Sequence, residues 1–201
     1  MTNSSFLHSV LAAALYVICL HGAAATHGEQ LVSAAKTQIG VTVKYDPRYE
    51  KLAYPGGDVP IERGVCTDVV IRAYRKLGID LQQLVHQDMK SALKAYPGLW
   101  QLRAPDRNID HRRVPNLQAF FTRHGTTLEP SREPSAYRPG DIVTWTVPPR
   151  LPHVGIVAAE KSSAGVPLII HNIGAGTRLE DRLFDFPITG HYRFTGAKGA
   201  P

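Results

Sequence analysis

Cysteine is scarce in this sequence of 201 residues, which contains only Cys19 and Cys66. Cys19 lies in an N-terminal segment that is expected to be removed, so no intramolecular disulfide is expected. The chain has no pair of cysteines with metal-ligand spacing and no H-E-x-x-H motif, which argues against a zinc site. It also lacks internal repeats, which excludes a repeat architecture.

Charge is missing from the first 25 residues, which contain no Lys, Arg, Asp or Glu. Val10 to Leu20 form an unbroken apolar run that is too short to cross a bilayer comfortably, and Ala23 to Ala25 offer a small-residue cleavage site. This pattern predicts a secretory signal peptide over residues 1–25 and a single mature domain over residues 26–201. A periplasmic or secreted bacterial protein follows, with no stable membrane insertion after cleavage; an uncleaved anchor is the alternative.

Basic residues outnumber acidic ones, 23 to 17, for a formal net charge of +6. Such a charge suits a protein that works near a polyanion, and a merely soluble basic surface is the alternative. The basic residues are scattered singly or in pairs such as Arg112-Arg113, so no nucleic-acid partner is expected. The oligomeric state is left open, with a monomer as the default.

Helical periodicity dominates the first half of the chain and strand-like runs the second half. Helices are predicted over residues 29–39, 66–77, 81–93 and 115–124. Strands are predicted over residues 141–145, 153–159, 167–173 and 188–194. Helices followed by strands indicate an α+β fold, with one layer of helices on one face of an antiparallel sheet.

Cys66 stands at the start of the second predicted helix, in "GVCTDVVIRAY". A helix start carries partial positive charge and free N–H groups, which favour a thiolate over a thiol. Asp68 works against this effect, so a nearby imidazolium is expected to contribute more of the activation. An unpaired cysteine in an exported protein is either used in this way or buried and inert.

Two histidines occur in strand-like contexts, His153 at the start of "HVGIVAA" and His171 at the end of "PLIIH". Adjacent antiparallel strands can bring two such residues to the same level of one face. A helix start packed on that face would complete a triad of Cys66, His153 and His171. The alternative for each histidine alone is a structural role.

The motifs "YPGGDVPIERGVC", "YRPGDIVTW", "LPHVGIV" and "LIIHNIG" resemble, in order and spacing, those of the NlpC-type cysteine peptidases, which are papain-like. The resemblance covers roughly residues 50–175. The whole chain also resembles a bacterial exported family that is named only as a domain of unknown function. The resemblance implies a papain-like fold with the nucleophile at a helix N-terminus.

By this resemblance, Cys66 is the nucleophile, His153 is the general base and His171 orients His153. Tyr54 matches a tyrosine that helps to bind substrate in that superfamily. Asn172 is the rival for the orienting role. The family's usual Asp-Cys-Ser-Gly is Val-Cys-Thr-Asp here, and the segment between the two histidines is longer than usual, so specificity does not carry over.

Two polar segments, "YDPRYEK" and "NIDHRR", are candidates for a substrate-binding wall. An Arg fork there would bind carboxylates of an acidic peptide. The alternative is a loop held by its own salt bridges. The candidate substrate-binding residues from these segments are Tyr45, Asp46, Asp110, His111 and Arg112.

These observations predict an exported cysteine hydrolase that cleaves an amide in peptidoglycan or its peptide fragments, without a cofactor or metal. An apolar groove beside Cys66 would favour a lipid substrate instead, and a basic, polar groove would favour wall peptide. Relatives of the superfamily also act on acyl groups of proteins. A non-catalytic wall-binding module is a third reading. A zinc site assembled from scattered residues such as His86, Asp88 and His191 is a fourth.

Overall fold

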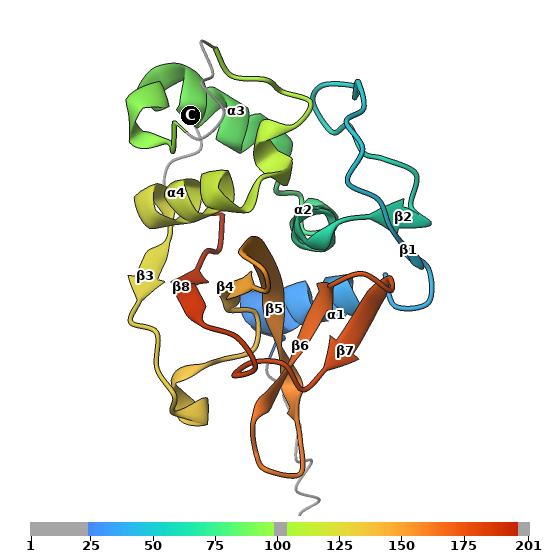
Figure 1. Cartoon of the computed structure of the whole chain (residues 1–201), viewed down its shortest axis with the longest axis vertical. Coiled ribbons are helices and arrows are strands. Elements are labelled where there is room, and N and C mark those ends of the chain that lie inside the picture. The colour runs from blue at the N-terminus through green and yellow to red at the C-terminus, as the bar shows by residue number, and fades with distance from the viewer. Residues whose placement is uncertain (1–23, 99–103, 197–201) are drawn as a thin grey trace, which may run out of the picture.

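The computed structural model describes residues 24–98 and 104–196, so the predicted signal peptide lies almost wholly outside the described residues. A six-stranded sheet with the order β3-β8-β4-β5-β6-β7 forms the lower half of the molecule in Figure 1. Every neighbouring pair in it is antiparallel. Its strands are β3 (Thr126–Leu128), β4 (Ile142–Val147), β5 (Leu151–Lys161), β6 (Pro167–Asn172), β7 (Thr177–Glu180) and β8 (Ile188–Arg193).

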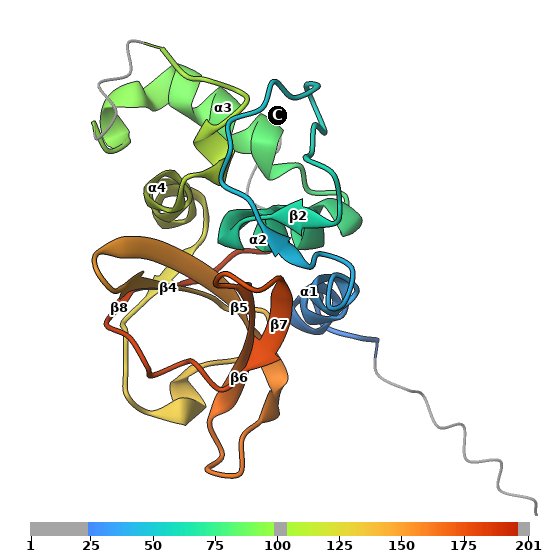
Figure 2. The same cartoon turned by 45° about the vertical axis from the view of Figure 1, so that its right-hand side comes forward.

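The helices gather on one side of the sheet. They are α1 (His27–Lys36), α2 (Cys66–Lys76), α3 (Leu81–Ala92) and α4 (Val114–His124), with short 3-10 turns η1 (Leu93–Ala95), η2 (Asp110–Arg112) and η3 (Pro134–Ala136). Helices α1 and α2 pack on β5 and β6, α4 packs on β5 and β8, and α3 lies farther out (Figure 2). The predicted α+β class, with helices packed on one face of an antiparallel sheet, is therefore confirmed, and α3 lies outside the layer that covers the sheet.

Two apolar clusters form on the two faces of the sheet because side chains alternate along each strand. The larger cluster joins the helices to Val154, Ile156 and Ile170. The smaller cluster lies on the other face, around Trp145 and Val157. Successive residues at the start of β5 therefore point alternately to the helix-side cluster and to the opposite face of the sheet.

The segment between α1 and α2 is long and mostly irregular, as its prolines and glycines predict. It contains a two-stranded parallel sheet of β1 (Lys44–Tyr45) and β2 (Arg63–Gly64), which was not predicted. Arg72 of α2 holds this segment in place, because its guanidinium binds Asp58 and donates to backbone carbonyls, including those of Val59 and Arg63.

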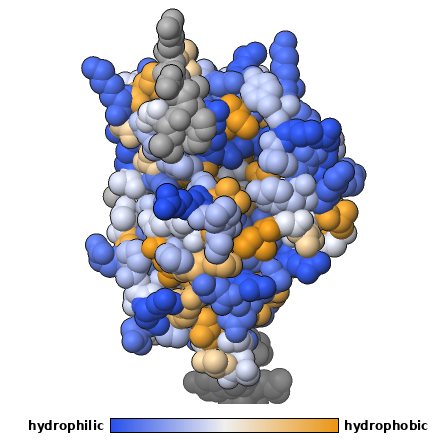
Figure 3. Space-filling model, in the orientation of Figure 1, coloured by the Kyte–Doolittle hydropathy of each residue, from blue (hydrophilic) through white to orange (hydrophobic). Residues whose placement is uncertain are grey.

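The four predicted strands correspond to β4, β5, β6 and β8, and the predicted helices to α1 to α4. The short strands β3 and β7 were not predicted. On the face shown in Figure 3, hydrophobic residues occur in small patches among hydrophilic ones. Within residues 24–98 and 104–196, no helix has the length and apolar character needed to cross a membrane.

Candidate active site

Cys66 is the first residue of α2, as predicted, and only 4% of it is exposed. Val65 caps the helix in an extended conformation, and its backbone N–H donates to Oδ2 of Asp68 at 2.7 Å. Asp68 therefore satisfies a backbone donor that would otherwise lack a partner at the helix start.

The start of α2 is tied to η2 by a buried ion pair. Arg112 donates from Nε to Oδ1 of Asp68 at 2.9 Å and from Nη2 to Oδ2 at 3.0 Å. The two side chains are 2% and 3% exposed. Thr67 adds a bond from Oγ1 to the Arg112 carbonyl at 3.0 Å. These contacts fix the turn of chain that carries the thiol.

His153 and His171 form a hydrogen-bonded pair across strands β5 and β6. Nε2 of His153 lies 2.7 Å from Nδ1 of His171, and both residues are buried. Gly155 makes room for the pair, because a Cβ there would lie 3.2 Å from Cβ of His171 and 2.6 Å from Cγ2 of Ile169. The expected meeting of the two histidines on adjacent strands is confirmed.

The two imidazoles lie on the sheet face opposite the helices. They alternate with Val154 and Ile170, whose side chains belong to the helix-side cluster. The ring of Trp145 packs beside His153, with ring centroids 5.8 Å apart. At this level of the sheet the helix side is occupied by the apolar side chains of Val154 and Ile170, and the start of α2 meets β5 at the backbone beside His153.

Glu180 extends the pair to a third member that was not predicted. Its Oε2 lies 3.0 Å from Nε2 of His171. The order His153–His171–Glu180 thus runs across three neighbouring strands. The only sequence signal was an acidic residue in the alternating run "TRLE", and its position diagonally across from His171 depends on the register of β6 and β7.

The thiol of Cys66 reaches β5 next to His153. Its sulfur lies against the backbone N–H of Val154, the residue that follows His153. Among residues 24–98 and 104–196, no hydrogen bond joins the thiol to the His153 ring. Because Nε2 of His153 is bonded to His171, Nδ1 is the nitrogen left for the thiol. Catalytic hydrogen bonds are often long until substrate binds.

Burial dominates the titration of both groups. It raises the pKa of the Cys66 thiol to about 12, while the backbone N–H of Val154 acts in the opposite direction. Burial, together with the neighbouring His171, lowers the pKa of His153 to about 3. The expected thiolate at the helix start is therefore not the resting form, because desolvation outweighs the helix N-terminus. At neutral pH the pair is a thiol and a neutral imidazole.

A pocket of about 240 Å³ opens beside the thiol. Most of its wall is apolar, and Leu151 and Pro152 at the start of β5 form part of it. The lining residues are Tyr45, Pro47, Val65, Cys66, Ile109, Arg112, Arg113, Val114, Pro115, Leu151 and Pro152. The predicted substrate residues Tyr45 and Arg112 are among them, whereas His153 is not. Partial burial raises the pKa of Tyr45 to about 12.

The other candidates from the two polar segments are buried, and the two aspartates are held by neighbouring side chains. Asp46 is buried and accepts hydrogen bonds from Arg48, which hold its pKa well below the ordinary value. Asp110 pairs with Arg113 at 3.0 Å. His111 is buried, and burial lowers its pKa to about 4. The geometry thus supports the alternative reading, loops held by their own salt bridges, for Asp46 and Asp110.

Tyr54 and Asn172 also lie outside the pocket lining. The ring of Tyr54 packs against His86, with centroids 5.2 Å apart, and beneath Arg107. Asn172 is fully buried and donates from Nδ2 to the Gly64 carbonyl at 3.0 Å. Asn172 therefore joins the end of β6 to β2, and His171 alone of the two contacts His153.

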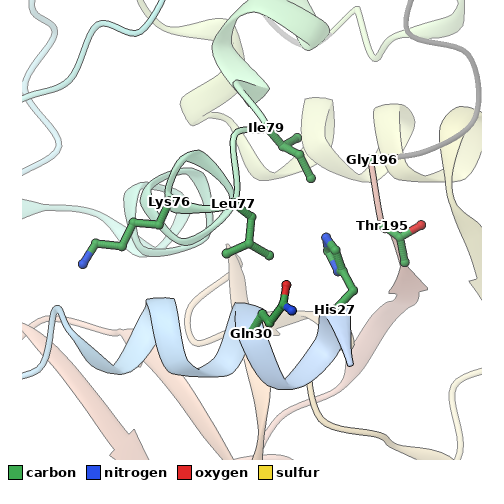
Figure 4. Close-up of a pocket in the computed structure, with 7 residues that line it drawn as sticks. All are labelled: His27, Gln30, Lys76, Leu77, Ile79, Thr195 and Gly196. Carbon is green, nitrogen blue, oxygen red and sulfur yellow. The ribbon is translucent and has the colours of Figure 1, made fainter. Parts of the chain in front are cut away.

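A larger hollow of about 530 Å³ lies between α1, the end of α2 and the segment after β8 (Figure 4). The polar side chains that line this hollow are those of His27, Gln30, Lys76 and Thr195. No cysteine that the structure describes lines this hollow, so the smaller pocket at Cys66 is the better candidate for thiol chemistry. No group of three or more His, Cys, Asp or Glu side chains suited to a metal ion is found in the part of the chain that the structure describes.

Comparison with known proteins finds a relative in sequence and structures of similar fold. The uncharacterized protein YijF of Escherichia coli (strain K12) is 54% identical over 164 residues, which cover 82% of this chain and 80% of YijF. In fold, the chain is similar to NlpC1 and NlpC2 of Trichomonas vaginalis, each with a TM-score of 0.48, at 19% and 17% identity. The alignments cover 87% of this chain, which spans about half the length of either structure (46% and 49%).

A family model described as "Domain of unknown function (DUF1287)" matches residues 32–194, which is most of the chain. This agrees with the resemblance to a family that is named only in that way. The chain belongs to the DUF1287 family.

Proposed function

We propose that this protein is a cysteine hydrolase that cleaves an acyl bond, with Cys66 as nucleophile and His153 as general base. The observation that carries the proposal is the position of the thiol. The thiol stands at the start of α2 and lines a pocket. Its sulfur contacts the backbone N–H of Val154, the residue after His153. Nε2 of His153 is in turn bonded to His171. These are the parts that thiol-based acyl transfer requires.

The first half-reaction begins with a neutral thiol. As the sulfur attacks the carbonyl carbon, its proton moves to Nδ1 of His153, which must approach the sulfur when substrate binds. We assign stabilisation of the oxyanion to backbone N–H groups at the start of α2, which lack partners within the helix. His153 then gives its proton to the leaving amine, and a thioester with Cys66 remains.

The second half-reaction restores the thiol. Water loses a proton to His153 and attacks the thioester, the acid product leaves, and the sulfur regains its proton. His171 orients His153 through the 2.7 Å contact in both halves. Burial of the imidazole keeps it in the basic, neutral form at neutral pH.

For the substrate, we propose an amide in peptidoglycan stem peptide, with the protein exported to the periplasm or beyond. The formal charge of +6 favours contact with the anionic wall. One observation favours a second candidate, an acyl compound with an apolar group. The pocket wall is mainly apolar, and the Arg112 guanidinium is already bound to Asp68.

The test compares the protein with its Cys66→Ala variant on two substrates. Purified peptidoglycan is digested and the released fragments are identified by mass spectrometry; nitrophenyl esters of increasing acyl length are followed by absorbance. Fragments released by the wild type alone would support the peptide substrate. Cysteine-dependent ester cleavage that improves with chain length would favour the apolar candidate. Equal activity of both variants, or no activity on either substrate, would contradict the proposal.

A further inference from the structure

A carboxylate lies at the far end of the histidine pair, two strands away from the thiol. We propose that Glu180 is a positioning residue that sets the proton arrangement of both imidazoles, so that Nδ1 of His153 is free to accept the proton of Cys66. The role of Glu180 in catalysis rests on the proposed hydrolase function. The order of the hydrogen bonds between Glu180, His171 and His153 does not depend on that function.

The position of Glu180 follows from the pairing of β6 with β7. His171 pairs with Arg178, and Ile169 pairs with Glu180, so Glu180 is a diagonal neighbour of His171 on the same face. The carboxylate spans that diagonal and brings Oε2 to 3.0 Å from Nε2 of His171. The Glu180 side chain is 25% exposed, whereas the His171 side chain is 1% exposed. The chain of contacts therefore runs from the buried interior to solvent.

The direction of the hydrogen bonds follows from what each atom can donate. A carboxylate only accepts, so Nε2 of His171 carries the proton in its bond to Glu180. In neutral His171, Nδ1 then has the lone pair and accepts from Nε2–H of His153 at 2.7 Å. Neutral His153 consequently keeps its lone pair on Nδ1. One carboxylate thus determines which nitrogen of a ring two strands away is basic.

The opposite arrangement would disable the base. If His171 carried its proton on Nδ1, Nε2 of His153 would accept, and Nδ1 of His153 would carry the proton of the neutral ring. That tautomer cannot take a proton from Cys66 at Nδ1. Glutamine at position 180 permits both arrangements, because its side-chain amide can donate as well as accept. With Glu180→Gln, the direction of the hydrogen bonds is therefore no longer fixed, while the size of the side chain is kept.

The matched control is Asp181→Asn. Asp181 is the next residue in the chain, is exposed, and lies just beyond the end of β7. Its substitution removes the same charge from the same part of the surface without touching His171. A general loss of negative charge near β7 would affect both variants, whereas loss of the hydrogen-bond direction would affect Glu180→Gln alone.

The decisive measurement is the nitrogen NMR spectrum of the protein labelled with ¹⁵N in its histidine rings. Signals of His153 and His171 are assigned by single substitution of each. We expect protonated Nε2 and unprotonated Nδ1 on both rings in the wild type and in Asp181→Asn, and a mixture of tautomers in Glu180→Gln. Protonated Nδ1 on His153 in the wild type, or identical spectra in the wild type and Glu180→Gln, would overturn the proposal.

A second readout connects the tautomer to the thiol. Cysteine-dependent turnover of the nitrophenyl ester or peptidoglycan that the wild type cleaves is expected to fall in Glu180→Gln in proportion to the fraction of His153 rings protonated on Nδ1, because only the other tautomer can act as the base. The rate should not change in Asp181→Asn. An unchanged rate in Glu180→Gln together with shifted tautomers would contradict the role of His153 as base, and hence the hydrolase proposal, while the positioning by Glu180 would stand.

Discussion

At the scale of single residues, the pKa of Cys66 distinguishes attack by a preformed thiolate from attack by a thiol that loses its proton during the reaction. A thiol with a low pKa would be a preformed thiolate, whereas this one is buried and its pKa is raised to about 12. The neutral form of His153 is favoured as well, because burial lowers its pKa to about 3. The resting site is therefore uncharged, and the proton must move during the attack.

This state predicts how Cys66 reacts with iodoacetamide as pH changes. Below its pKa the thiolate fraction rises tenfold with each pH unit, so the alkylation rate should climb without a plateau from pH 6 to about 10. The rate is measured by mass spectrometry under native conditions, with Cys66→Ala as the blank. A plateau that begins below about pH 8 would show a preformed thiolate and contradict the neutral resting pair.

Some of these residues could be predicted from the sequence and others could not. Cys66, His153 and His171 stand in short motifs at element boundaries, where local spacing carries the information. Glu180 stands in a strand of four residues, and its role depends on which residue of β6 it faces. The resting protonation was missed for a similar reason, because burial is set by packing that local sequence does not contain.

At the scale of elements, the contact between η2 and α2 positions the thiol. The polar run "NIDHRR" reads as a solvent-exposed loop, yet Asp110, His111 and Arg112 are all buried. Their burial was not predictable, because Arg112 finds its partner Asp68 at a separation of 44 residues. The helices themselves were predictable, since their apolar periodicity and end signals are local.

The ion pair between Asp68 and Arg112 gives a prediction about stability. Arg112→Met leaves a buried carboxylate without its partner, which should lower the free energy of unfolding by roughly 3–5 kcal/mol. The double variant Asp68→Asn with Arg112→Met removes both charges and should recover much of that loss. Urea unfolding followed by circular dichroism measures both values.

The control for this pair is Arg182→Met, since Arg182 forms an exposed ion pair with Asp185. Exposed pairs contribute about 0–1 kcal/mol, so its loss should be small. A double variant that is no more stable than Arg112→Met would mean that the guanidinium matters through packing and not through the charge of Asp68.

At the scale of the whole molecule, the order of elements decides the architecture. Helices precede strands, so an antiparallel sheet with helices on one face was predictable from the sequence. The two-sided environment of β5 was not predicted. It results from alternation, which sends Val154 to the helices and His153 to the opposite face. The thiol consequently reaches the strand backbone beside the imidazole.

Net charge is also a property of the whole molecule, and it predicts that binding to peptidoglycan, the proposed substrate, depends on salt. With a formal charge of +6, the Cys66→Ala variant should sediment with purified peptidoglycan at about 0.01 M salt, where the Debye length is about 30 Å. It should be released at about 1 M salt, where that length is about 3 Å. Protein in the pellet and in the supernatant is measured across the salt range.

Charge reversal at the exposed residues Lys44 and Lys51 makes the test specific. Changing both to Glu lowers the formal charge from +6 to +2, because each substitution removes one positive charge and adds one negative charge. Retention at low salt should then weaken, whereas the paired control Lys44→Arg with Lys51→Arg should bind as before. If the protein stays in the peptidoglycan pellet regardless of salt and of charge reversal, binding would be mainly apolar, as the apolar pocket wall would allow.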